Sequence, residues 1–175
     1  MSLIFEKITA SYHQSLPFVC FKKPKASKLK AYFGENTVLN YSTTFKDEGF
    51  LFAPFNNEKK SIIFLKKLFQ IVEEPFFKNT ETFPEKKFKV QIEDKKNHLE
   101  LVLAGIDAIK KNSFKKVVLS RKENVKLTSF DLIEVFEKLL QKYENAFVYV
   151  WFHPKVGLWL GATPDRKSTR LNSSH

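Results

Sequence analysis

A lysine begins an apolar run in the segment 114–121, Phe-Lys-Lys-Val-Val-Leu-Ser-Arg. The β-forming residues from Val117 to Leu119 follow Lys116 directly and predict a short buried strand. A lysine at the mouth of a buried strand loses hydration, and burial lowers the pKa of an ammonium group. The pattern therefore predicts that Lys116 acts as a general base. The alternative is that Lys115 and Lys116 only end a helix.

A second stretch of interest lies about forty positions downstream. Residues 157–164, Gly-Leu-Trp-Leu-Gly-Ala-Thr-Pro, predict a strand that runs into a turn of small residues. Together, the motifs KVVLSR and LGATP resemble the chorismate-utilising enzymes, and within that family they are most similar to the isochorismate synthases. The resemblance covers mainly residues 95–164. Over the first ninety residues it rests on Gly-Phe-Leu-Phe-Ala-Pro-Phe at 49–55.

The resemblance implies an isomerase that moves a hydroxyl group on chorismate. Water attacks C2 of the ring while the C4 hydroxyl leaves, which requires a base on one face and an acid on the other. By resemblance, Lys116 activates the water, whereas Gly161, Ala162 and Thr163 let the substrate ring approach the main chain. Mg²⁺ is the implied cofactor and holds the substrate carboxylate. The magnesium-binding glutamates of the family lie further along the sequence, so we expect no metal ligands in this chain.

The catalytic acid of the family is a glutamate that follows Gly-Ala-Thr-Pro, and this chain has Asp165 at that position. The composition changes abruptly there, because residues 165–175 contain two of the three arginines and no aromatic residue. This tail can be encoded by a common sequencing-library adapter read in frame. We therefore expect residues 1–164 to be the N-terminal part of a chorismate-binding domain and residues 165–175 to be an adapter-derived artefact. On this interpretation the chain is truncated and inactive.

The lysine also selects among related activities. Family members that use ammonia, such as anthranilate synthase, have glutamine at the position of Lys116, so a lysine favours water as the nucleophile. Salicylate synthase shares the lysine, adds pyruvate elimination and is the nearest alternative. Two alternatives from other classes are a non-catalytic basic binding protein and a folded but inactive homologue. The resemblance places the product in menaquinone or siderophore biosynthesis.

Composition and charge exclude several other classes of protein. The net charge of +11 would suit a nucleic-acid binder, but the basic residues are 27 lysines and 3 arginines scattered along the chain. Nucleic-acid binders use arginine for bidentate contacts, so we expect no nucleic-acid partner. The longest apolar run, Ala146 to Phe152, is too short to cross a bilayer, so we expect no membrane partner. The single cysteine, Cys20, fits a reducing cytoplasm and a buried structural thiol.

The elements that must position these residues follow from hydrophobic periodicity. Helices are predicted over 3–13, 95–111 and from a capping box at Thr128 and Asp131 to Tyr143. The further predicted strands are 17–22, 37–41, 49–52, 61–64, 147–153 and 156–161. Asn112 is predicted to end the second helix in a left-handed conformation, and residues 75–90 to form an exposed connection, with an edge strand at 88–92 as the alternative. The expected class is α+β, with antiparallel sheets, outer helices and part of the chorismate-utilising enzyme fold.

Overall fold

The computed structural model describes residues 2–44, 46–56, 58–78, 92–120, 122–127 and 129–163, and for 92–94 the main chain alone. The chain divides into two compact units. The first comprises Met1–Glu81 and Asp131–His175, and the second Thr82–Phe130. The helices are α1 (Leu3–His13), the short 3₁₀ helix η1 (Lys66–Leu68), α2 (Ile92–Lys110) and α3 (Leu132–Lys142).

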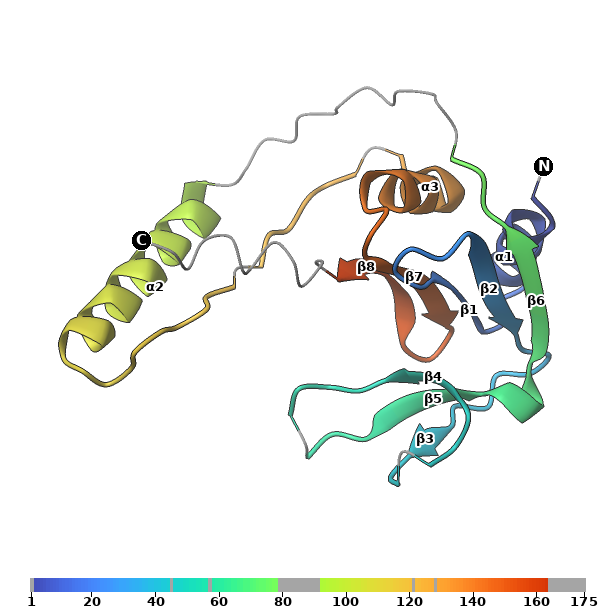
Figure 1. Ribbon diagram of the computed structural model, residues 1–175, viewed down its shortest axis with the longest axis horizontal. Helices are drawn as coiled ribbons and strands as arrows, with labels where there is room; N and C mark the ends of the chain where they lie inside the picture. The colour runs from blue at the N-terminus through green and yellow to red at the C-terminus, as the bar shows by residue number, and fades with distance from the viewer. Residues whose placement is uncertain are drawn as a thin grey trace. The chain divides into compact units, whose positions relative to one another are not determined.

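The strands of the first unit form two antiparallel sheets (Figure 1). The strands are β1 (Phe18–Lys22), β2 (Lys28–Phe33), β3 (Tyr41–Ser42), β4 (Gly49–Phe52), β5 (Ser61–Leu65), β6 (Gln70–Pro75), β7 (Phe147–His153) and β8 (Gly157–Thr163). The larger sheet has the strand order β6-β2-β1-β7-β8, and the smaller has the order β3-β5-β4. β7 and β8 come from the far end of the sequence, yet β7 pairs directly with β1.

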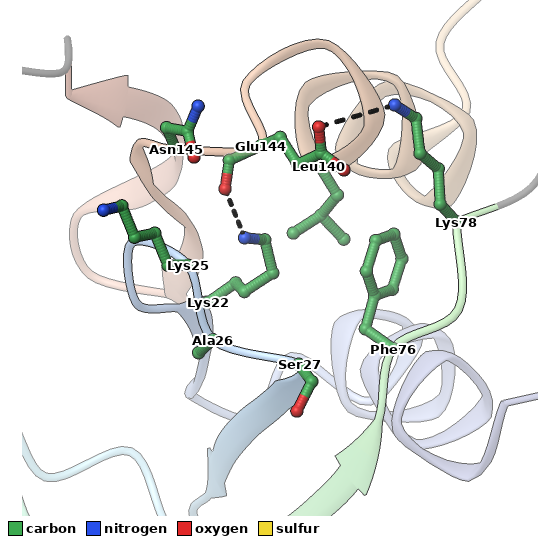
Figure 2. Close-up of a pocket in the computed structure, with 9 residues that line it drawn as sticks. All are labelled: Lys22, Lys25, Ala26, Ser27, Phe76, Lys78, Leu140, Glu144 and Asn145. Atoms are coloured by element: carbon green, nitrogen blue, oxygen red, sulfur yellow. Dashed lines mark hydrogen bonds and ion pairs between the residues drawn. The ribbon is translucent and has the colours of Figure 1, made fainter.

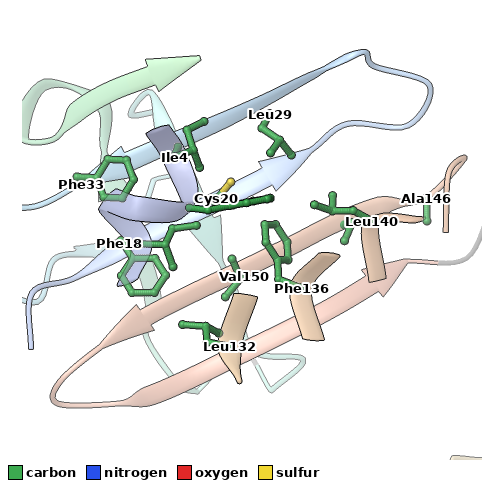
Figure 3. Packing of buried hydrophobic residues seen from close by; sticks show 14 residues of the cluster. Ile4, Phe18, Cys20, Leu29, Phe33, Leu132, Phe136, Leu140, Ala146 and Val150 are labelled. Atoms are coloured by element: carbon green, nitrogen blue, oxygen red, sulfur yellow. The ribbon is translucent and has the colours of Figure 1, made fainter. Parts of the chain in front are cut away.

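The helices α1 and α3 cover one face of the larger sheet, as Figure 1 shows. Because side chains alternate along a strand, the residues Phe18 and Cys20 of the central strand β1 face these helices. Figure 3 shows Phe136 of α3 and Ile4 of α1 among the buried residues of this layer. Asp131 caps α3, since its side chain accepts a hydrogen bond of 2.9 Å from the main-chain N–H of Glu134.

The opposite face of the larger sheet packs against the smaller sheet through aromatic residues. Val19 and Phe21, which alternate with the residues that face the helices, contribute to this second core. The ring of Phe21 stacks on that of Phe50 of β4, with 5.6 Å between the ring centroids. The centroids of Trp151 of β7 and Phe64 of β5 are also 5.6 Å apart, with the rings edge to face. Both faces of β1 are therefore buried, which explains why this strand is apolar from Phe18 to Phe21.

The fold class is α+β, as the sequence predicted, with antiparallel sheets and outer helices. The predicted helix 3–13, the strand 17–22, the strands 49–52 and 61–64 and the hairpin after α3 are confirmed within one or two residues. The prediction of a strand over 37–41 is wrong, because only Tyr41 and Ser42 pair in this region. Two strands were not predicted, β2 and β6.

The second unit is built on α2, which matches the predicted helix 95–111. Asn112 has φ of 59° and thus the predicted left-handed conformation. The following N–H, of Ser113, donates to the main-chain oxygen of Ala108 at 2.9 Å and closes the helix end. The predicted connection 75–90 lies from residue 79 onward outside the described residues, as do Thr128 and residue 91. Across the part of the chain that the structure describes, no helix has the length and apolarity to cross a bilayer.

Candidate active site

Lys116, the predicted base, lies in the second unit in an extended segment that follows α2 and has no regular secondary structure. Its side chain is exposed, and that of Val118 is 85% exposed. The prediction that residues 117–119 form a buried strand is therefore wrong. A strand is completed by main-chain hydrogen bonds to a neighbouring strand, and none of the described residues pairs with this segment.

One face of this segment packs against α2 at a glycine. A Cβ placed on Gly105 would lie 3.3 Å from Cδ1 of Leu119 and 3.4 Å from Cγ1 of Val117. These two residues therefore lie against the helix, and in an extended chain the residues between them point the opposite way. Lys116, the neighbour of Val117, is thus on the face that turns away from α2.

Gly161, Ala162 and Thr163, the predicted substrate-binding residues, lie in the first unit within β8. They do not form the predicted turn, because the strand continues through Thr163. Ala162 is opposite Val148 in the pairing of β7 with β8. The hydroxyl of Thr163 accepts a hydrogen bond of 3.2 Å from the main-chain N–H of Phe147. Pairing with β7 thus extends to the last described residue of the LGATP motif.

Sequence reasoning missed Tyr149, which lies across from Gly161 on β7. A Cβ on Gly161 would be 2.6 Å from the hydroxyl oxygen of Tyr149 and 2.7 Å from its ring carbon Cζ. The space that a side chain would fill at Gly161 therefore holds the tyrosine ring. Burial raises the pKa of the Tyr149 phenol, which keeps it protonated and able to donate a hydrogen bond. An aromatic residue paired with a glycine across a hairpin is the sequence signal that could have identified it.

The other predicted residues lie outside this hairpin in the sequence. Asp165, at the position of the family's acid, lies outside the described residues. Lys116 and the hairpin residues belong to different units, so the residues that the structure brings together are Gly161, Ala162, Thr163 and Tyr149. Cys20 is fully buried, and this burial raises the pKa of its thiol, as expected for a structural residue and not a nucleophile.

The described residues also bear on the implied magnesium ion. Among them, no group of three or more histidine, cysteine, aspartate or glutamate side chains is arranged to hold a metal ion. Mg²⁺ prefers several carboxylate or other oxygen ligands, so the side chains of the described residues do not fit it.

Comparison with protein families connects both motifs to one group of enzymes. The family model described as chorismate binding enzyme matches residues 41–173, which is more than half of the chain and includes Lys116 and the LGATP motif. Comparisons with curated proteins and with solved structures gave no significant match. The matched range also contains β3, β4, β5 and the β7–β8 hairpin with Tyr149. The chain belongs to the chorismate binding enzyme family.

Proposed function

We propose that this protein is an isochorismate synthase, an isomerase that converts chorismate to isochorismate with water as the nucleophile. Membership of the chorismate binding enzyme family supports a chorismate-utilising enzyme and chorismate as the small-molecule substrate. The observation that carries the finer assignment is Lys116 in the motif KVVLSR, inside the matched range. A lysine there favours water over ammonia as the nucleophile, because the family members that use ammonia have glutamine at this position.

The proposed roles follow from the proton balance of the reaction. The amine of Lys116 takes a proton from a water molecule while the oxygen of that water bonds to C2 of the substrate ring. The bond between C4 and its hydroxyl breaks, the ring double bonds shift, and an acid protonates the leaving hydroxyl. One water enters and one leaves, so substrate and product are isomers. Asp165 stands at the sequence position of the acid.

A lysine can accept a proton only as the neutral amine. Desolvation is the common way in which enzymes favour this form, because burial disfavours the charged ammonium. The exposed segment around Lys116 does not supply such burial within the second unit. The proposal therefore requires that Lys116 become enclosed in the enzyme with chorismate bound. The unpaired face that carries Lys116 and Val118, opposite α2, is available for this enclosure.

Two features enter the proposal from the resemblance and not from geometry. Magnesium is proposed as the cofactor, although the described residues offer no set of ligands for it. The hairpin residues Gly161, Ala162 and Thr163 are proposed to lie against the substrate ring. Because Tyr149 fills the side-chain space at Gly161, its hydroxyl is proposed to lie against a ligand that approaches there.

The experiment is a product analysis with the purified natural full-length protein. The protein is incubated with chorismate and Mg²⁺, with and without ammonium, and the products are separated by chromatography. Isochorismate alone is the expected product. Salicylate with equimolar pyruvate would instead show the salicylate synthase alternative, and anthranilate formed with ammonium would overturn the assignment of water as the nucleophile. Salt-sensitive binding of DNA or RNA without turnover would favour the non-catalytic alternative.

A further inference from the structure

A half-open cavity of about 330 Å³ lies in the first unit, and none of the residues assigned to the reaction lines it. It is enclosed by the end of β1, the β1–β2 turn, the residues that follow β6 and the end of α3 (Figure 2). Its lining comprises Lys22, Lys25, Ala26, Ser27, Phe76, Lys78, Leu140, Glu144 and Asn145.

The lining carries an excess of positive charge. Three lysines, Lys22, Lys25 and Lys78, face one carboxylate, Glu144, which leaves two positive charges. The ammonium of Lys78 lies 3.6 Å from the Glu144 carboxylate, so this acid is held by one lysine at the rim. The other two lysines are not neutralised by a further acid among the residues that line the cavity.

Lys22 gives the cavity a buried charge. The residue is only 3% exposed, and its ammonium donates a hydrogen bond of 2.8 Å to the main-chain oxygen of Glu144, as Figure 2 shows. Burial lowers the pKa of this lysine, while the nearby Glu144 charge acts in the opposite direction. An ammonium has three N–H donors, and within the described residues Glu144 is the acceptor that the structure gives to it. Buried charges are normally paired and hydrogen-bonded, so the remaining donors favour an anionic ligand.

The turn that carries Lys25 supports the same conclusion. Lys25 has φ of 59°, a conformation that costs free energy for a residue with a side chain. It follows Pro24, and the turn is closed by a hydrogen bond of 3.1 Å from the N–H of Ala26 to the oxygen of Lys23. This turn carries Lys25 at the cavity wall.

We propose that this cavity binds a small doubly charged oxyanion, either a phosphate or a dicarboxylate. Two unneutralised ammonium groups match a charge of −2. Phe76 and Leu140 form an apolar side that accommodates the carbon skeleton of a dicarboxylate. The inference does not rest on the proposed reaction, because no lining residue has a role in it.

The test is isothermal titration calorimetry of the 175-residue chain with inorganic phosphate and, separately, with succinate. Saturable binding of at least one of them is expected. Lys25→Ala and Lys78→Ala are expected to weaken binding by about three- to tenfold each, as lost charged contacts at a partly exposed site do. Glu144→Gln removes the opposing charge but keeps the main-chain acceptor of Lys22, so it is expected to tighten binding.

A matched control separates a site from general attraction to a basic protein. Lys59→Ala removes the same charge from an exposed lysine that does not line the cavity, so it is expected to leave binding unchanged. Tighter binding of phosphate than of succinate would assign the site to phosphates, and the reverse order to dicarboxylates. Absence of saturable binding, an equal loss in Lys59→Ala, or weaker binding in Glu144→Gln would each overturn the proposal.

Discussion

The hydroxyl oxygen of Tyr149 lies 2.6 Å from the point at which a Cβ of residue 161 would be placed, and the two residues are direct partners across β7 and β8. The ring carbon Cε1 of the tyrosine lies 2.9 Å from the same point. Cβ atoms do not approach other atoms so closely, so the ring can occupy this position only above a glycine. The glycine of the LGATP motif therefore has a packing role within the hairpin, whatever it contributes to substrate binding.

Gly161→Ala is expected to destabilise the first unit by about 1–3 kcal/mol, the usual cost of overpacking a well-packed site. The added methyl group must displace the Tyr149 ring, which also contacts Phe147 and Phe52. The free energy of unfolding is measured with urea for the wild-type and variant chains.

A double-mutant cycle identifies the cause. In the background Tyr149→Leu, which removes the ring, Gly161→Ala should cost much less than in the wild-type chain. An equal cost in both backgrounds would show that the penalty comes from the strand and not from the tyrosine.

Most of the first unit could be predicted from sequence, because its elements have clear periodicity. The apolar run Phe18–Phe21 of β1 and the hairpin around Pro154 are examples, and both are observed. The strand β2 was missed because lysines alternate with its first apolar residues. The strand β6 was missed because Glu73, Glu74 and Pro75 are residues that strands seldom contain except at the edge of a sheet. The strand β6 forms only by pairing with β2, about forty residues earlier in the sequence.

The candidate site was predicted less completely. The motif around Lys116 has the composition of a strand, but strand formation depends on a partner that local sequence does not specify. Tyr149 was missed because its role appears only through its register opposite Gly161. The cavity at Lys22 brings together residues from four segments, a juxtaposition that no local pattern contains.

The buried His153 predicts a loss of stability in mild acid. It is 2% exposed, and its Nδ1 accepts a hydrogen bond of 3.2 Å from the main-chain N–H of Lys155. Burial lowers the pKa of His153 below its ordinary value of 6.5, a contact with the Val38 main chain opposes this, and the charge of Lys155 adds to it. A histidine with a lowered pKa binds fewer protons in the folded state, so its contribution is present above pH 6.5 and lost as the pH falls below it.

The free energy of unfolding should therefore decrease between pH 7 and about pH 5, measured by urea titration at fixed ionic strength. His153→Gln removes the titrating group and keeps an acceptor, so its stability should depend less on pH in this range. The expectation fails if wild-type and variant chains show the same dependence.

The contact between α2 and the segment of Lys116 can be tested at Gly105. Gly105→Ala has two opposing effects, a gain of up to about 1 kcal/mol in helix propensity and mild crowding of Leu119 and Val117 at 3.3 and 3.4 Å. Because these side-chain ends can move by a few tenths of an ångström, we expect little net change in the urea midpoint. Gly105→Leu cannot be accommodated this way and should displace the segment, seen by NMR as loss of the short proton–proton contacts between α2 and the methyl groups of Val117 and Leu119. Absence of these contacts in the wild-type chain would mean that the packing is not maintained in solution.

The last prediction compares two adjacent lysines in the gene product that is assayed for isochorismate formation. Lys116→Ala should lower kcat by about a hundredfold to ten-thousandfold, the usual contribution of a general base, without a comparable change in KM. Lys115→Ala is the matched control, since it removes the same side chain and charge one residue away. Val117 and Leu119 lie against α2 at Gly105, so alternation places Lys116, the neighbour of Val117, on the open face. A greater loss of kcat in Lys115→Ala would mean that the base is Lys115 and not Lys116.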